Sequence, residues 1–161
     1  MASVRKANWL AFLLPAALLG GALISQYGFG LYPCEMCMWQ RWPHLAAIIL
    51  ALPALMLGLK PLSRLLVFAA ALAILVSGLI GGFHAGVEYD WWEGLTSCAT
   101  SIPAGGDILD SIMNAPLVRC DVAPWSLFGI SLAGYNFLLS VGGAILILVM
   151  LVTGRRESDY V

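Results

Sequence analysis

The sequence predicts an all-α membrane protein: a single domain, residues 1–161, built as a bundle of four antiparallel transmembrane helices. Composition and hydropathy both favour this fold class. Hydrophobic residues make up 61% of the chain and charged residues only 11%, whereas a typical soluble domain carries about 25% charged residues. Four apolar runs have close to the roughly 20 residues that a helix needs to cross a bilayer, and they cover residues 9–27, 39–59, 65–84 and 125–153.

The first two runs carry distinctive flanking or internal residues. Residues 9–27 follow the basic pair Arg5 and Lys6, as in a secretory signal, but the run is longer than the apolar core of a cleaved signal peptide. We therefore expect it to remain as the first span. The second run contains Pro43, which removes a helical hydrogen bond and predicts a bend near the start of that span.

The third and fourth runs contain no lysine, arginine, aspartate or glutamate. One such charge at the centre of a span would cost about 2.5–3.5 kcal/mol. The linker between the second and third runs is short, which makes these neighbours antiparallel. Small residues predict close helix packing in lipid, and they include Gly20, Gly21, Gly78, Gly81, Gly82, Gly142 and Gly143.

The basic residues predict the orientation of the bundle. If the amino terminus is cytoplasmic, only Arg41 and Arg119 lie outside, as the positive-inside rule favours. Both termini are then cytoplasmic, and the outer loops cover about residues 28–38 and 88–124. The basic residues that fall inside are Arg5, Lys6, Lys60, Arg64, Arg155 and Arg156.

The second outer loop contains one segment with helical periodicity. Residues 107–117 place their apolar side chains on one stripe, formed by Ile108, Leu109, Ile112 and Met113. We expect a short amphipathic helix there, lying on the membrane or on the end of the bundle.

All four cysteines fall in the two outer loops: Cys34 and Cys37 in the first, Cys98 and Cys120 in the second. We infer one disulfide pair within each loop, since disulfides persist on the oxidising side of a membrane. Cys98–Cys120 could be a structural staple. Cys34–Cys37 closes almost no loop and contributes little stability, which favours a redox-active pair. Zinc sites with four cysteines usually use two close pairs, so we expect no metal.

The residues around the first pair favour a reactive thiolate. Pro33 is suited to the first turn of a helix, and Cys34, Cys37 and Arg41 then lie on one face at i, i+3 and i+7. A helix amino terminus and an arginine both stabilise a thiolate. The sequence has no flavin or nicotinamide motif, so a lipid-soluble quinone is the electron acceptor that fits this position.

These residues resemble a known family. A four-span chain with PCEMCMWQR (33–41) at its second span and a later cysteine pair resembles the DsbB family, particularly its alphaproteobacterial members. HAGVE (84–88), WWEG (91–94) and the CD-x-x-PW pattern at 120–125 also match. The resemblance implies a quinone-dependent protein-disulfide oxidoreductase of the bacterial inner membrane, with its active cysteines on the periplasmic side.

The resemblance also implies roles for individual residues. A reduced periplasmic DsbA-like protein of the thioredoxin fold would attack at Cys98, and Cys120 would exchange with Cys34. Cys37 would pass electrons to ubiquinone or menaquinone, with Arg41 beside the quinone. We also expect His84 to contribute to the quinone site.

Three alternatives remain open at this point. His44 and His84 could hold haem in an electron-transfer protein, or the chain could be a quinone-coupled thiol enzyme of the vitamin K epoxide reductase type. A transporter or structural subunit is the third, but transporters usually carry polar groups in mid-membrane. Here the candidates are chiefly Asn136 and Ser77, which we interpret as packing residues.

Overall fold

The computed structural model describes residues 2–58, 60–95, 99–100 and 117–159. Four helices in these ranges are long and apolar enough to cross a membrane, which confirms the predicted fold class. They are α1 (Ala2–Phe29), α2 (Glu35–Leu57), α3 (Pro61–Glu88) and α5 (Leu132–Asp159). Helix α2 continues through Pro43 and Pro53 without a break.

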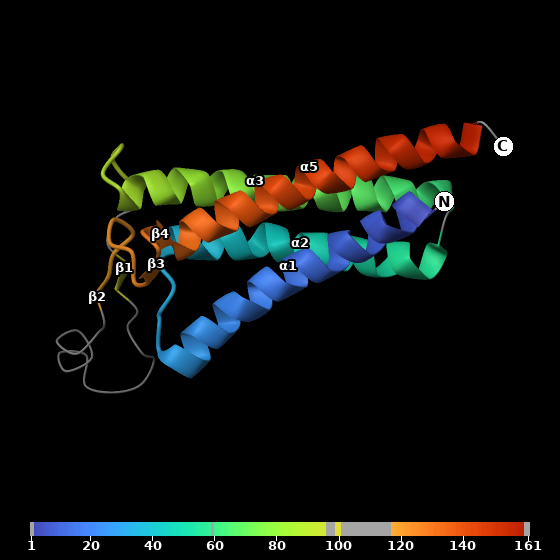
Figure 1. The fold of residues 1–161 in the computed structure, drawn as a ribbon. Helices are drawn as coiled ribbons and strands as arrows, with labels where there is room; N and C mark the ends of the chain where they lie inside the picture. The colour runs from blue at the N-terminus through green and yellow to red at the C-terminus, as the bar shows by residue number, and fades with distance from the viewer. Residues whose placement is uncertain (1, 59, 96–98, 101–116, 160–161) are drawn as a thin grey trace.

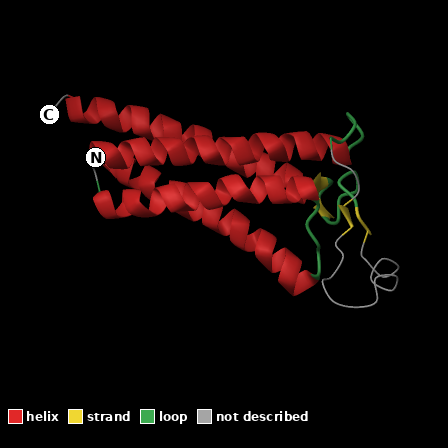
Figure 2. Ribbon diagram, turned by 180° about the vertical axis from the view of Figure 1, so that it is seen from behind, coloured by secondary structure: helices red, strands yellow, loops and turns green. Residues whose placement is uncertain are grey.

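The helices form a bundle in which α2 packs between α1 and α3, and α5 packs between α3 and α1. Both termini and the α2–α3 connection lie at one end, whereas the loops that carry the cysteines lie at the other (Figures 1 and 2). Helix α1 diverges from the bundle toward the loop end, in both views. The end at which α1 diverges is also the end that contains Cys34, Cys37 and Cys120, the three cysteines among the described residues.

The core near the termini is built from small side chains, mostly alanines, which let helices approach closely in lipid. Four of the glycines predicted to permit such packing do so, namely Gly78, Gly81, Gly82 and Gly143. A Cβ on Gly78 would lie 2.9 Å from Cγ2 of Val141, and one on Gly143 would lie 2.1 Å from Cδ2 of Leu14. By contrast, a Cβ on Gly20, Gly21 or Gly142 would meet nothing within 4 Å.

The fourth span differs from its expected bounds. Helix α5 begins at Leu132, not at residue 125, because a hairpin of β3 (Ser126–Leu127) and β4 (Ile130–Ser131) precedes it. Phe128 and Gly129 form the turn with φ of 51° and 77°, a left-handed backbone that cannot continue a helix and suits a two-residue hairpin turn. Helix α3 continues to Glu88, past the expected end at residue 84.

The second outer loop is described only at its two ends. There β1 (Ala99–Thr100) pairs antiparallel with β2 (Leu117–Val118). Only residue 117 of the amphipathic helix predicted for residues 107–117 is among the described residues. Cys98 lies outside them.

Candidate active site

Cys34 caps the amino terminus of α2. Its φ of −75° and ψ of 175° are extended, and its sulfur accepts a hydrogen bond of 3.3 Å from the backbone N–H of Cys37. A serine, threonine or aspartate oxygen usually occupies this place. The helix therefore begins just after Pro33, close to the predicted start, and the cap directs the Cys34 sulfur toward Cys37.

Cys34 and Cys37 are both thiols in this structure, with their sulfurs 3.0 Å apart and Cys34 donating to Cys37. That hydrogen bond, together with burial, raises the pKa of the Cys34 thiol to about 12, although a contact with His84 acts in the opposite direction. The proton of the pair consequently stays on Cys34, and the sulfur of Cys37 is the one that receives a hydrogen bond.

Arg41 lies on α2 as predicted, but its guanidinium is directed toward α1. It donates to the carbonyl of Ala22 at 3.2 Å and to Oε1 of Gln26 at 2.5 Å, and it approaches the sulfur of Met38 at 3.8 Å. None of these partners is a cysteine, so Arg41 does not stabilise the thiolate by direct contact as the spacing suggested. It ties α1 to α2 beside the dithiol.

His84 brings the thiols of the two loops together. Its Nε2 lies 3.5 Å from the Cys34 sulfur and 3.7 Å from Oε1 of Glu88. One side-chain atom each of Cys34, His84 and Cys120 lies within 4.8 Å of the other two, and all three residues are buried. Cys120 of the second loop is therefore close enough to Cys34 for exchange to need only a small movement.

The same three atoms form a nitrogen and sulfur set of the kind that zinc binds. A tetrahedral site would need a fourth ligand, and the cluster of described residues offers three. Since these sulfurs are also the redox groups, such a site could form only in the reduced protein.

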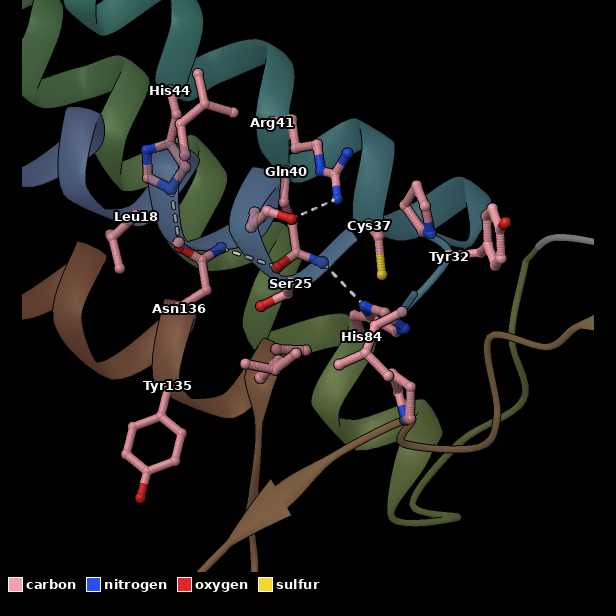
Figure 3. Close-up of a pocket in the computed structure, with 18 of the residues that line it drawn as sticks. Leu18, Ser25, Tyr32, Cys37, Gln40, Arg41, His44, His84, Tyr135 and Asn136 are labelled. Carbon is pink, nitrogen blue, oxygen red and sulfur yellow. Dashed lines mark hydrogen bonds between the residues drawn. The ribbon is translucent and has the colours of Figure 1, made fainter. Parts of the chain in front are cut away.

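A cavity of about 250 Å³ lies between α1, α2, α3 and α5, with Cys37 in its wall and His84 and Glu88 contributed by α3. Figure 3 shows Cys37, Gln40, Arg41, His44, His84 and Asn136 around this cavity. Most of the remaining lining is apolar, including Leu18, Leu19 and Leu132, and α1 contributes small residues such as Gly21 and Ala22. An apolar chamber with a few convergent polar groups is typical of a site for a small organic molecule.

A second cavity of about 290 Å³ lies on the loop side of the dithiol, lined in part by Cys34, Val118 and Arg119. Cys37 and His84 line both cavities. Leu31, Tyr32 and Pro124 do so as well, so the dithiol lies where the chamber within the helices adjoins the one beneath the second loop.

A polar chain forms part of the inner chamber, and the sequence analysis missed it. Gln40 lies 2.9 Å from Nδ1 of His84 and 2.8 Å from Asn136, which in turn lies 2.9 Å from His44 (Figure 3). Spacing could have revealed it, because residues 37, 40 and 44 recur at i, i+3 and i+7 on one helical face.

Both ring nitrogens of His84 have protein partners, which argues against its use as a haem ligand.

A dithiol at the end of a spanning helix, with a cysteine of another loop beside it, is the arrangement of a membrane thiol–disulfide oxidoreductase. The family profile described as disulfide bond formation protein DsbB matches residues 4–150. The chain therefore belongs to the DsbB family, as the sequence motifs suggested, and is a multi-pass membrane protein of disulfide bond formation.

Individual relatives agree with the family assignment. Disulfide bond formation protein B of Chromohalobacter salexigens is 34% identical, over 89% of this chain and 77% of the relative. The protein of the same name from a Polaromonas species is 29% identical, over 95% and 94% of the two chains. A Rickettsia prowazekii protein described as uncharacterized is 27% identical, over 83% and 80%. No solved structure matches the chain significantly.

Proposed function

We propose that this protein reoxidises a periplasmic DsbA-like dithiol protein and passes the electrons to a membrane quinone through two exchanging cysteine pairs. The observation that carries the proposal is the position of Cys37. Its sulfur is 3.0 Å from that of Cys34, Cys34 is close to Cys120, and Cys37 also lines the inner chamber. A thiol in that position can take part in disulfide exchange through Cys34 and can give up electrons to a molecule bound in the inner chamber.

The proposed sequence starts at Cys98, which the partner's thiolate attacks in the Cys98–Cys120 disulfide. Cys120 leaves as a thiolate and attacks Cys34, which breaks the Cys34–Cys37 disulfide and leaves Cys37 as the thiolate. The second thiol of the partner then resolves the mixed disulfide. Cys98 then attacks Cys120 in the Cys34–Cys120 disulfide, which re-forms Cys98–Cys120 and releases Cys34. In sum, the partner loses two electrons and two protons and gains a disulfide, and the Cys34–Cys37 pair is left as a dithiol that holds those electrons and protons.

The inner chamber fits the headgroup of a quinone. Its walls are mostly apolar, and the polar side chains that line it include Gln40, Arg41, His44 and Glu88. A bound quinone would supply a two-electron, two-proton acceptor. The chain's own residues would orient the ring, exclude water and keep the Cys37 sulfur at the chamber wall.

The family relationship and the four spans support an inner-membrane location with the cysteines on the periplasmic side. Four basic residues lie at the end of the bundle away from the cysteine loops, which is consistent with that orientation. They are Arg5, Lys6, Lys60 and Arg64. In this orientation Cys98 would be on the periplasmic side, where a DsbA-like protein of the thioredoxin fold could reach it.

The test is turnover with a reduced DsbA-like protein and ubiquinone-1 by the purified full chain, comparing Cys37→Ser with Cys120→Ser. We expect Cys37→Ser to abolish quinone reduction. Cys120→Ser should also stop partner oxidation but should still allow dithiothreitol to reduce the Cys34–Cys37 pair and, through it, ubiquinone-1. Turnover that survives in Cys37→Ser would overturn the proposed role of Cys37.

A further inference from the structure

The polar chain beside the dithiol links α2, α3 and α5 through consecutive hydrogen bonds. His44 Nε2 lies 2.9 Å from Asn136 Oδ1, and Asn136 Nδ2 lies 2.8 Å from Gln40 Oε1. Gln40 Nε2 then lies 2.9 Å from His84 Nδ1, and His84 Nε2 lies 3.5 Å from the Cys34 sulfur. The last bond runs from Cys34 to Cys37 at 3.0 Å.

Two backbone carbonyls determine which way the amides point. Gln40 also donates to the carbonyl of Met36 at 3.1 Å, and Asn136 donates to the carbonyl of Ser77 at 3.2 Å. A carbonyl can only accept, so the nitrogen of each amide must be the atom at that position. The oxygens of Gln40 and Asn136 are therefore fixed as acceptors for the preceding donor in the chain.

The amide orientations then determine the hydrogen positions on both histidines. The oxygen of Asn136 accepts, so Nε2 of His44 donates. The nitrogen of Gln40 donates to Nδ1 of His84, so a neutral His84 ring carries its hydrogen on Nε2. That atom lies 3.5 Å from the Cys34 sulfur and 3.7 Å from Oε1 of Glu88, the buried carboxylate that also faces this site. Every hydrogen bond from His44 to Cys37 consequently runs in the same direction.

We propose that Gln40, Asn136 and His44 are positioning residues of the thiol site, forming with His84 a one-directional hydrogen-bond chain that stabilises negative charge on the Cys34–Cys37 pair. Hydrogen bonds in such a chain polarise one another in a low-dielectric interior. His84 donates to the Cys34 sulfur, and a donor to a sulfur favours its thiolate. Cys34 is therefore a better leaving group when the Cys34–Cys120 disulfide is broken. This role rests on the thiol chemistry proposed above, but it requires neither the quinone nor the partner.

The packing of α3 against the chain supports a specific role. A Cβ on Gly81 would lie 3.0 Å from Nδ2 of Asn136 and 3.1 Å from Oε1 of Gln40. No side chain fits at position 81 without pressing on the hydrogen bond between the two amides. Ser140 adds a second donor, at 2.8 Å, to the oxygen of Asn136, and buried polar groups in a membrane interior are typically functional.

The experiment measures how the alkylation rate of the Cys34–Cys37 dithiol depends on pH. The full chain carries Cys98→Ser and Cys120→Ser, so that iodoacetamide can reach only this pair, and neither quinone nor partner is added. We expect Gln40→Met to raise the midpoint of the pH profile by roughly one unit. Asn136→Leu should raise it by less, because it breaks the chain one bond further away.

Asn8→Leu is the matched control. Asn8 is a buried asparagine that donates to the carbonyl of Gly58 and to Ser63 near the opposite end of the bundle. Its loss should lower stability without moving the midpoint. If Gln40→Met or Asn136→Leu fails to fold, Gly81→Ala, which removes no polar group, should raise the midpoint slightly. An unchanged midpoint in the chain variants, or an equal shift in Asn8→Leu, would overturn the proposal.

Discussion

The sulfur of Cys34 lies 3.5 Å from Nε2 of His84, although 50 residues separate the two in sequence. This contact joins the first turn of α2 to the last turn of α3. It places the helix cap that carries the redox motif beside a histidine that lines both chambers. The environment of the Cys34 thiol therefore depends on a residue of a different helix.

The first prediction concerns which thiol reacts in the reduced protein. Cys34 keeps its proton at neutral pH because hydrogen bonding to Cys37 and burial raise its pKa from 9.0 to about 12, and alkylation requires a thiolate. Iodoacetamide at pH 7 to 8 should modify Cys37 before Cys34, as peptide mass spectrometry can determine. Preferential labelling of Cys34 would contradict the hydrogen-bond direction.

The same shift predicts how stability depends on pH. A raised pKa means that the folded reduced protein holds the Cys34 proton more tightly than the unfolded chain does. The contribution to stability is complete below about pH 9 and is lost as the pH rises toward 12. Unfolding of the reduced protein in detergent should therefore become easier over that range, and Cys34→Ser should reduce this dependence.

The inner chamber can be tested by filling it. A Cβ on Gly21 would meet nothing within 4 Å, and Gly21 lines the chamber. Gly21→Leu should therefore fold. It should raise the KM for ubiquinone-1 by roughly tenfold or more, because the leucine would block a few apolar contacts between the quinone and the chamber wall. Thiol exchange with the partner should stay near the parent rate.

Gly20→Leu is the control for that variant, since a Cβ there also meets nothing within 4 Å and Gly20 is not a lining residue. Its KM should match that of the parent. A similar rise in both variants would mean that bulk on α1, and not occupation of the chamber, causes the effect.

Arg41 should matter more for quinone use than for exchange. Its bonds to Ala22 and Gln26 hold α1 against α2 at the chamber, and a shorter imidazole cannot span the same distance. Arg41→His should raise the KM for ubiquinone-1 while exchange at Cys98 continues. Gln26→Met, which removes one partner of Arg41, should give a smaller rise. Equal loss of both activities in Arg41→His would contradict this division.

Packing at the outer end of α3 predicts a stability effect. A Cβ on Gly86 would lie 2.0 Å from Cζ2 of Trp92, which stacks on Phe83 and donates to its carbonyl. Gly86→Ala should displace this tryptophan and destabilise the protein by about 1–3 kcal/mol. Gly142→Ala, where a Cβ meets nothing within 4 Å, should leave the thermal unfolding midpoint in detergent nearly unchanged.

The sequence by itself determined the class of fold and the redox motif. Length and hydropathy suffice for the four spans, because a bilayer imposes a minimum apolar length that few soluble helices reach. The spacing of Cys34 and Cys37 suffices for a reactive pair, because a bridge that closes almost no loop has little structural value. The family followed from those same motifs.

Only the tertiary structure decided the environment of the thiols. The direction of Arg41 toward α1, the approach of Cys120 to Cys34, and the chain from His44 to Cys37 all depend on contacts between helices. Gln40 and Asn136 are ordinary polar residues in sequence, and 96 positions separate them. Their roles arise because burial in lipid leaves each polar group dependent on whichever partner the packing brings within reach.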